Sequence, residues 1–221
     1  MTNQPGDIFR SLAPTERAEL DRLIAYNVYA SGQIFHSPNE VGEQLFVLRS
    51  GRVRLYKLSA EGRTLTLAVL DPVAVFGEMA LVDQRLHDSF AETMSESVVG
   101  VIGRGTLRSV LERHPLVAIA FMEMMGSRLR AMENRLADIA FKSVPQRLAS
   151  MLLSLAGADG PRPATPAVVR YTHQQLAEMI GSYRETVTKA IGEIREAGLI
   201  RIDEDGILIT DLERLKRLAN R

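Results

Sequence analysis

The segment at residues 182–189, SYRETVTK, carries side chains with a clear capacity for chemical recognition. Arg184 and Glu185 are adjacent, and Thr188 and Lys189 follow one helical turn later. An arginine can donate two parallel hydrogen bonds to guanine O6 and N7, and a glutamate can accept one from cytosine N4. Phosphates repel a carboxylate, so a glutamate here favours base reading over a general electrostatic role. We predict a helix in which Arg184 and Glu185 read a G·C pair and Thr188 and Lys189 also contact bases.

Two helix starts surround a glycine turn in this region. Thr172 precedes the run HQQLAEMI and has Gln175 three residues later, which is the capping-box pattern of a helix start. Ser182 and Glu185 repeat that pattern after an Ile-Gly pair. Two short helices joined by a glycine turn are typical of a helix-turn-helix. The strand-like runs LIRI and ILIT follow around an Asp-Gly turn, which predicts a β-wing.

Helical periodicity indicates which face of the second helix is free. With Val187 at zero and about 100° per residue, Ile191 and Ile194 fall within about 40° of it and form a buried face. The residues about 100–200° away face solvent, and they are Glu185, Thr188, Lys189 and Gly192. A glycine at 198 is predicted to end the helix. The alternative is a helix-turn-helix that packs against protein and leaves Arg184 and Glu185 on a solvated face.

Composition excludes several classes of protein. The chain has 221 residues, 46% hydrophobic and 24% charged, which suits one large or two small globular domains rather than a disordered chain. Long apolar runs and a basic start followed by an apolar core are both absent from the sequence, so we expect no membrane span and no signal peptide. The formal net charge of zero argues against a polycation that coats nucleic acid but allows a local basic face.

Cysteine is absent, and the four histidines are scattered. The lack of thiols excludes disulfides, thiolate metal sites, iron–sulfur clusters and cysteine nucleophiles. The histidines have no metal-ligand spacing, so we predict no metal site, while a single haem-ligating histidine stays open. A Gly-rich phosphate loop, a Ser/His/Asp arrangement and paired carboxylates are not visible in the sequence, so we assign no catalytic residue and do not expect an enzyme.

The first half of the chain predicts a helical lead-in and then a β-domain. Residues 7–26 have helical spacing, which Pro14 is expected to break. Short Val-, Leu- and Tyr-rich runs at 45–48, 53–58 and 65–70 are separated by turns at Ser50-Gly51 and Glu61-Gly62. Regularly spaced short strands of this kind are typical of an antiparallel sandwich or small barrel.

A long helix with an apolar seam follows. Residues 106–113 predict a short helix, and Pro115 suits the first turn of the next. The seam repeats at intervals of three and four residues over about 27 Å of helix, and it consists of Met122, Met125, Leu129, Met132, Leu136 and Ile139. Charged residues flank this narrow stripe, which favours a parallel dimer over an amphipathic helix packed on its own core. Pro145 then restarts the chain, and residues 157–167 predict a loop.

These motifs together resemble the cyclic-AMP receptor protein/FNR (CRP/FNR) family of bacterial transcription regulators over roughly residues 8–211. SYRETV at 182–187 is close to the family's recognition-helix signature, and FGEMAL at 76–81 resembles its effector-pocket segment. The resemblance implies an α+β fold: a β-roll sensor at 1–105, a dimerisation helix and hinge at 106–142, and a winged helix-turn-helix at 143–221. It also implies a cytoplasmic homodimer that binds double-stranded DNA and RNA polymerase, most often as an activator.

By the same resemblance, two recognition helices would enter successive major grooves of an inverted repeat with TGTGA- or GTG-like half-sites. Thr172, His173 and Ser182 would contact phosphates, because helix N-termini favour anions. A cyclic-nucleotide sensor whose helix-turn-helix binds another protein is the alternative.

The effector segment departs from the cyclic-AMP-binding members. The resemblance places an effector pocket at Gly77, Glu78, Met79, Asp88, Ser89, Met132 and Glu133. Those members have Arg-Ser/Thr-Ala where this chain has Asp88-Ser89-Phe90, so an acid replaces the phosphate-binding arginine unless Arg85 moves in. Met132 and Glu133 replace their adenine-facing Thr-Ser pair. Cyclic AMP is therefore disfavoured, which leaves another small effector, a haem or none. His36 and His87 are the haem candidates in the sensor, and we expect both at the surface or in turns.

Overall fold

The computed structural model describes residues 7–81, 86–157, 168–204 and 206–220. Two compact units divide the chain: Met1–Glu61 with Leu67–Ala131, and Gly62–Thr66 with Met132–Arg221. The long helix α3 (Pro115–Phe141) contributes to both units. The three-part division with boundaries after residues 105 and 142 stays a prediction.

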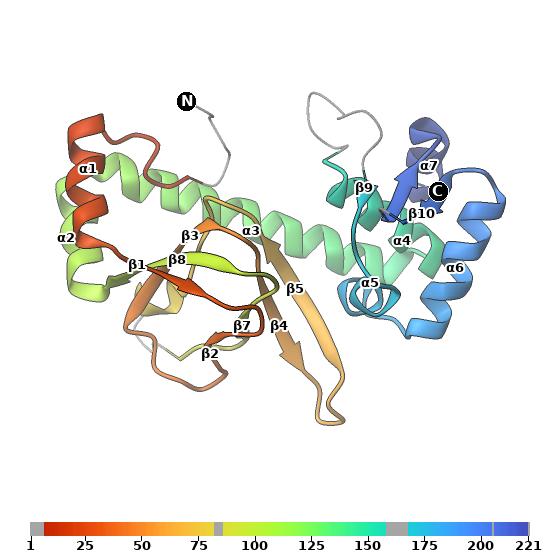
Figure 1. Ribbon diagram of the computed structural model, residues 1–221, viewed down its shortest axis with the longest axis horizontal. Helices are drawn as coiled ribbons and strands as arrows, with labels where there is room; N and C mark the ends of the chain where they lie inside the picture. Colours follow the sequence, from red (N-terminus) through yellow and green to blue (C-terminus); the bar gives the residue numbers. More distant parts are fainter. Residues whose placement is uncertain (1–6, 82–85, 158–167, 205, 221) are drawn as a thin grey trace. The chain divides into compact units, whose positions relative to one another are not determined.

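The first unit is built on a β-roll of two sheets (Figure 1). One four-stranded sheet has the order β1-β8-β3-β6, and the other has the order β2-β7-β4-β5. The strands are β1 (Ala25–Tyr29), β2 (Ile34–His36), β3 (Gln44–Ser50), β4 (Val53–Leu58), β5 (Thr64–Leu70), β6 (Val75–Phe76), β7 (Phe90–Thr93) and β8 (Ser97–Gly103). The predicted strands at 45–48, 53–58 and 65–70 are thus confirmed.

Strand β3 separates two hydrophobic cores, because successive side chains of a strand point to opposite faces. Leu45 and Val47 pack with helices, while Phe46 and Leu48 join the core between the sheets. Phe46 stacks on Phe76 with ring centroids 4.9 Å apart. This alternation explains a run of four buried apolar residues in one strand, and it fixes the register of β3 against β6 and β8.

Helices cover the outer face of the β3 sheet. These are α1 (Pro14–Leu23), α2 (Arg104–Arg113) and the first turns of α3, and they share a core with Ile8 and Phe9. The expectation that Pro14 breaks a helix is wrong, because α1 begins at this proline. The first helical position tolerates proline, since its missing N–H would have no partner there. The predicted helix at 106–113 and the restart at Pro115 are confirmed.

The apolar seam of α3 is exposed in the single chain. Met122, Leu129 and Leu136 have exposed fractions of 64%, 59% and 69%. Met132 and Ile139 are also exposed, and Met125 is half-buried. Burying apolar surface is worth roughly 25 cal/mol per Å², so a continuous stripe of this kind favours a partner surface.

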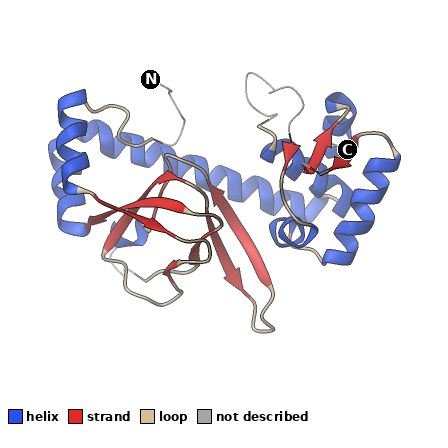
Figure 2. Ribbon diagram, viewed as in Figure 1, coloured by secondary structure: helices blue, strands red, loops and turns tan. Residues whose placement is uncertain are grey.

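The second unit combines helices with a small sheet (Figure 2). Its helices are α4 (Val144–Leu155), α5 (His173–Ile180), α6 (Arg184–Glu196) and α7 (Leu212–Ala219). Strands β10 (Ile200–Asp203) and β11 (Gly206–Ile209) form the predicted wing, and β9 (Val168–Val169) adds a third strand. Strand β9 and helix α7 were not predicted from the sequence. Gly157 ends the turn after α4, and the rest of the predicted loop lies outside the described residues.

Candidate DNA-binding and effector sites

The start of α5 is built by a reciprocal cap. The Thr172 hydroxyl accepts a hydrogen bond from the Gln175 backbone N–H at 3.1 Å, and the Gln175 side chain accepts one from the Thr172 N–H at 2.9 Å. Both helix-end donors are therefore satisfied, as the sequence predicts. Gly181 then adopts a left-handed conformation with φ 64°, which lets the chain turn sharply into α6.

The second predicted capping box does not form. Helix α6 begins at Arg184 with Tyr183 as N-cap, and no side-chain hydrogen bond caps it. The Ser182 N–H donates to the Ala177 carbonyl, so Ser182 completes the end of α5 rather than starting α6. Ser182 still lies in the turn beside the N-terminus of α6, where backbone N–H groups favour an anion.

One face of α6 is buried and the other is free, as predicted. Val187, Ile191 and Ile194 are each at most 2% exposed. Arg184, Glu185, Thr188 and Lys189 are exposed, and Gly192 is half-buried. Gly198 ends the helix with φ 72°, and the N–H groups of Gly198 and Leu199 return to the carbonyls of Arg195 and Ile194.

Arg184 and Glu185 occupy the first turn of α6. Within the described parts of the chain, the side chains of Arg184, Glu185 and Lys189 make no hydrogen bond or ion pair. A carboxylate in this turn complements the positive end of the helix. The Arg184 guanidinium and the Lys189 ammonium are therefore available to bind another molecule.

His173 and Thr188 connect the two helices. The His173 Nδ1 lies 3.0 Å from the Thr188 hydroxyl, and that hydroxyl donates to the Arg184 carbonyl at 2.9 Å. The Thr188 oxygen therefore accepts from His173, which fixes the start of α5 against the first turn of α6. The structure thus brings a predicted phosphate contact and a predicted base-reading residue into direct contact.

Arg135 ties the end of α3 to α5 within the second unit. Its guanidinium donates to the Met179 carbonyl in the last turn of α5, where the helix dipole favours a cation. Burial lowers the pKa of Arg135. The sequence did not indicate this role, since it showed Arg135 only as one of the charged residues that flank the apolar seam.

The predicted effector residues of the first unit lie around an ion pair. Gly77 is buried with φ 81°, and a Cβ there would lie 2.8 Å from the Phe46 ring. Glu78 pairs with Arg128 of α3 at 3.1 Å, and the Arg128 guanidinium also donates to the Val75 carbonyl. Both charged side chains are about one-fifth exposed. Met79, which directly follows Glu78 in the sequence, is half-buried.

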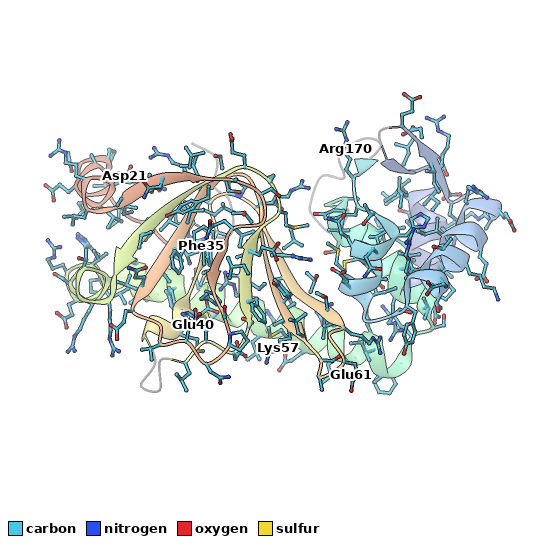
Figure 3. All side chains as sticks on the ribbon, turned by 60° about the horizontal axis from the view of Figure 1, so that its bottom comes forward. Asp21, Phe35, Glu40, Lys57, Glu61 and Arg170 are labelled. Atoms are coloured by element: carbon cyan, nitrogen blue, oxygen red, sulfur yellow. The ribbon has the colours of Figure 1, made fainter. Side chains whose placement is uncertain are left out.

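Asp88 is paired with a lysine that sequence reasoning missed. The Lys57 ammonium on β4 lies 3.1 Å from the Asp88 carboxylate, and Figure 3 labels Lys57 on that strand. Burial by itself raises the pKa of Asp88, but the hydrogen bond and charge of Lys57 and a hydrogen bond with Ser89 outweigh it and leave the pKa lowered. The carboxylate is therefore ionised and carries its negative charge beside Lys57.

The remaining predicted effector residues differ in how exposed they are to solvent. Ser89 is buried, with 7% of its surface exposed, whereas Met132 and Glu133 are exposed on α3. Arg85 lies outside the described residues.

Known domain families match both halves of the chain. A cyclic nucleotide-binding domain matches residues 26–114, and a Crp-like helix-turn-helix domain matches residues 146–218. The CRP-like cAMP-activated global transcriptional regulator of Mycobacterium tuberculosis is 32% identical over 216 residues, which cover 96% of each chain. The chain belongs to the CRP/FNR family of transcription regulators.

Two further relatives support the family and the fold. The cyclic AMP receptor protein of Thermus thermophilus is 27% identical over 215 residues, or 96% of each chain. The structure of a CooA mutant from Carboxydothermus hydrogenoformans has a TM-score of 0.80 at 21% identity and covers 99% of this chain and 97% of its own. The predicted α+β fold class and family are confirmed. Among the described residues of this CRP/FNR protein, no helix is long and apolar enough to cross a membrane.

His36 and His87 form a buried pair in the CRP/FNR sensor, so the expectation of surface or turn histidines is wrong. Each is 5% exposed, and their rings stack with centroids 3.8 Å apart and planes 9° apart. The His36 Nδ1–H donates to the Ser89 carbonyl at 2.9 Å. The two residues are far apart in sequence, and they meet because β2 pairs with β7 and the His87 backbone hydrogen-bonds to Asn39 and Glu40.

The histidine pair does not form a ready ligand site. In the described part of the chain, no group of three or more His, Cys, Asp or Glu side chains is placed to hold a metal ion. A haem would need the segments around both rings to open, because each ring is covered by the other and by the β-roll. The buried rings instead pack as neutral groups, and His36 has His87 and the rings of Phe46 and Phe76 as its neighbours.

The histidine pair predicts a loss of stability in acid. Burial and the neighbouring His87 lower the pKa of His36 from 6.5 to about 4, although Glu78 and Glu40 act in the opposite direction; burial also lowers the pKa of His87. Between pH 6.5 and 4 the unfolded chain binds more protons than the folded chain, so the free energy of unfolding falls as the pH falls. We expect His36 to account for about 3 kcal/mol of this loss.

Denaturant unfolding of the wild-type protein and of His36→Phe at fixed protein concentration, between pH 7.5 and 4.5, measures this loss. The variant should show a shallower fall in the free energy of unfolding with pH, whatever its stability at pH 7.5. An identical pH dependence in both proteins would contradict the role of His36.

Proposed function

We propose that the protein is a cytoplasmic, homodimeric and sequence-specific regulator of transcription that acts through DNA and RNA polymerase, most often as an activator. The observation that carries this proposal is the exposed, unpartnered Arg184 and Glu185 in the first turn of α6. They belong to a Crp-like helix-turn-helix. A guanidinium beside a carboxylate suits the edge of a G·C pair.

The parts around α6 have distinct roles in this proposal. Arg184 and Glu185 read bases, together with Lys189 and the exposed Thr188. The Thr188 hydroxyl is held by His173 and the Arg184 carbonyl, so its methyl group is left for contact with a thymine methyl. Thr172, His173 and Ser182 would contact phosphates and fix the register of the helix on the duplex.

The homodimer follows from the seam on α3. Two copies joined along this stripe would bury its exposed methionines and leucines, and each copy would present one recognition helix. Half-sites in successive major grooves lie about 34–36 Å apart. An inverted repeat with TGTGA- or GTG-like half-sites is the matching operator.

The effector in this proposal is a small molecule other than cyclic AMP, or there is none. A cyclic phosphate placed as in the cyclic-AMP-binding members would approach the Asp88 carboxylate, which Lys57 holds ionised. The Glu78–Arg128 pair already satisfies its own charges. The phosphate would therefore meet a like charge at Asp88 and would have to compete with that carboxylate for the Lys57 ammonium.

A cyclic-AMP-dependent regulator with an unusual phosphate-binding segment is the second candidate. It is supported by the names of the relatives from Mycobacterium tuberculosis and Thermus thermophilus, which refer to cyclic AMP. In this case Arg128 or Lys57 would supply the positive charge that the cyclic phosphate needs.

Removal of the Arg184 guanidinium should weaken specific DNA binding by about 1–3 kcal/mol per half-site and relax the preference at one G·C pair. The measurement is a fluorescence-anisotropy titration of a palindromic TGTGA-type duplex and of variants with one changed pair, at two salt concentrations. The wild-type protein should prefer the palindrome and bind more weakly at higher salt.

Arg195→Ala is the matched control, because Arg195 is an exposed arginine in the last turn of the same helix. It should keep the preference among duplexes. A uniform loss across all duplexes in Arg184→Ala would assign Arg184 to a phosphate. Absence of any sequence preference in the wild-type protein, with and without effector candidates, would reject the proposed function.

Leu129→Glu should convert the protein to monomers and abolish operator binding, because buried like charges would face each other across the dimer. Asn134→Glu is the control, since this exposed residue lies on α3 away from the seam. Light scattering measures the mass of each. A stable dimer of Leu129→Glu would show that another surface joins the protomers.

Calorimetric titration with cyclic AMP distinguishes the two candidates for the effector. We expect no saturable heat for the wild-type protein and a measurable affinity for Asp88→Arg, since the substitution replaces a repulsive charge with an attractive one. Glu19→Arg changes an exposed residue of α1 by the same charge, so it is the matched control and should not bind cyclic AMP. Saturable binding to the wild-type protein would establish the cyclic-AMP-dependent candidate instead.

A further inference from the structure

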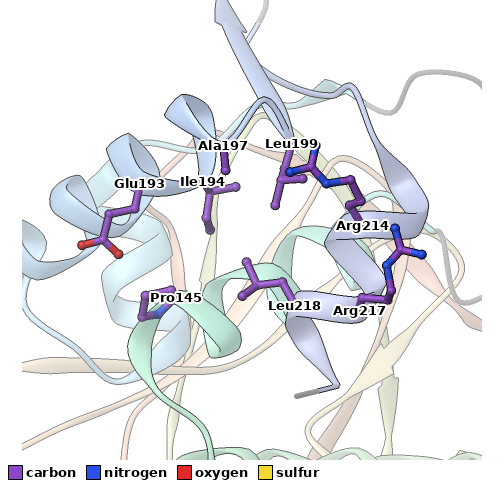
Figure 4. A pocket seen from close by; sticks show the side chains of 8 residues that line it. All are labelled: Pro145, Glu193, Ile194, Ala197, Leu199, Arg214, Arg217 and Leu218. Atoms are coloured by element: carbon purple, nitrogen blue, oxygen red, sulfur yellow. The ribbon is translucent and has the colours of Figure 1, made fainter.

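A cleft of about 440 Å³ lies wholly within the second unit (Figure 4). Its walls come from the start of α4, the last turns of α6, the entrance to β10 and helix α7. The volume lies within the roughly 300–1,000 Å³ typical of small-molecule sites. Its lining residues do not include Arg184, which lies at the other end of α6, or any residue assigned to the effector pocket.

The floor of the cleft is apolar. Ile194 and Leu199 are 2% and 5% exposed, and Pro145, Ala197 and Leu218 complete the apolar lining. Ile194 and Leu199 belong to the buried core of the second unit, so this part of the floor has a fixed shape. It suits the hydrocarbon part of a ligand.

The rim of the cleft is charged and asymmetric. Arg214 and Arg217 lie three residues apart on α7, and Figure 4 shows both on one side of the opening with Glu193 on the other. Arg214 has a long contact of 3.9 Å with Asp211, its neighbour at the start of α7. Among the described residues, the Arg217 side chain has no hydrogen bond or ion pair. Both guanidinium groups can thus still receive an anion.

Charge and shape together define one class of ligand. Two guanidinium groups and one carboxylate line the rim and give it one net positive charge, and Asp211, outside the lining, lies 3.9 Å from Arg214 and offsets part of that charge. Adjacent arginines can hold a carboxylate through charge-assisted hydrogen bonds, whereas Glu193 would repel a second negative charge. We propose that this cleft binds a small amphipathic monoanion, with its acid group on Arg214 and Arg217 and its apolar body on Ile194, Leu199 and Leu218.

This site is independent of the proposed function, because its occupancy can be measured without DNA. Octanoate is the probe for the full-length protein, with octan-1-ol as the uncharged match and inorganic phosphate as the anion without an apolar body. Methyl NMR spectra of protein labelled at Ile and Leu report on Ile194, Leu199 and Leu218 directly. Octanoate should shift these three signals saturably, and the other two probes should bind at least about tenfold more weakly.

The paired variant Arg214→Gln with Arg217→Gln should lose about tenfold or more in octanoate affinity. Lys216→Gln is the matched control, because it removes a cation from the same helix outside the cleft. Glu193→Gln should tighten binding about twofold by removing the opposing charge.

Three outcomes would overturn the proposal. They are unshifted signals from the three cleft residues at saturating octanoate, equal binding of octanoate and octan-1-ol, and unchanged affinity in the paired arginine variant that keeps the wild-type spectrum. If the spectrum shows that the paired arginine variant is misfolded, the same titration is done with Glu193→Lys, which leaves both arginines in place. That variant should tighten octanoate binding, and an unchanged affinity would count against the site.

Discussion

Burial of one face of α6 is the constraint on which the proposed activity depends. Val187, Ile191 and Ile194 are enclosed by the rest of the second unit, and burying each such side chain is worth roughly 1.5–3 kcal/mol. A rotation of the helix that exposed them would cost several kcal/mol. Arg184 and Glu185 are therefore held outward by the apolar residues behind them, and within the described residues their side chains make no hydrogen bond or ion pair.

Local hydrogen bonds add precision to this arrangement. The cap at Thr172 fixes where α5 begins, and the left-handed Gly181 sets the angle at which the chain enters α6. The link from His173 through Thr188 to the Arg184 carbonyl joins the two helices at the end that carries the reading residues. Arg135 supports the opposite end of α5. Together these hydrogen bonds restrain the first turn of α6 relative to the apolar core of the second unit.

In the sensor unit, by contrast, the charged side chains at the candidate effector site are paired with opposite charges. Glu78 pairs with Arg128, Asp88 pairs with Lys57, and the buried rings of His36 and His87 stack on each other. A ligand that enters this region must offer enough new contacts to replace these pairs. The sensor of this CRP/FNR protein thus holds both carboxylates in ion pairs of its own.

Periodicity and capping residues determined a large part of this protein by themselves. The buried face of α6, the glycine turn, the start at Pro115 and the exposed seam on α3 were all readable from sequence, because each depends on neighbours within a few residues. Pro14 and Ser182 were misjudged, since a proline can begin a helix and a cap depends on where the preceding turn ends. Only the tertiary structure could decide the His36–His87 stack, the ion pairs of Glu78 and Asp88, and the cleft beside α7. These features join residues tens of positions apart, and their geometry depends on strand pairing and helix packing that no local pattern encodes.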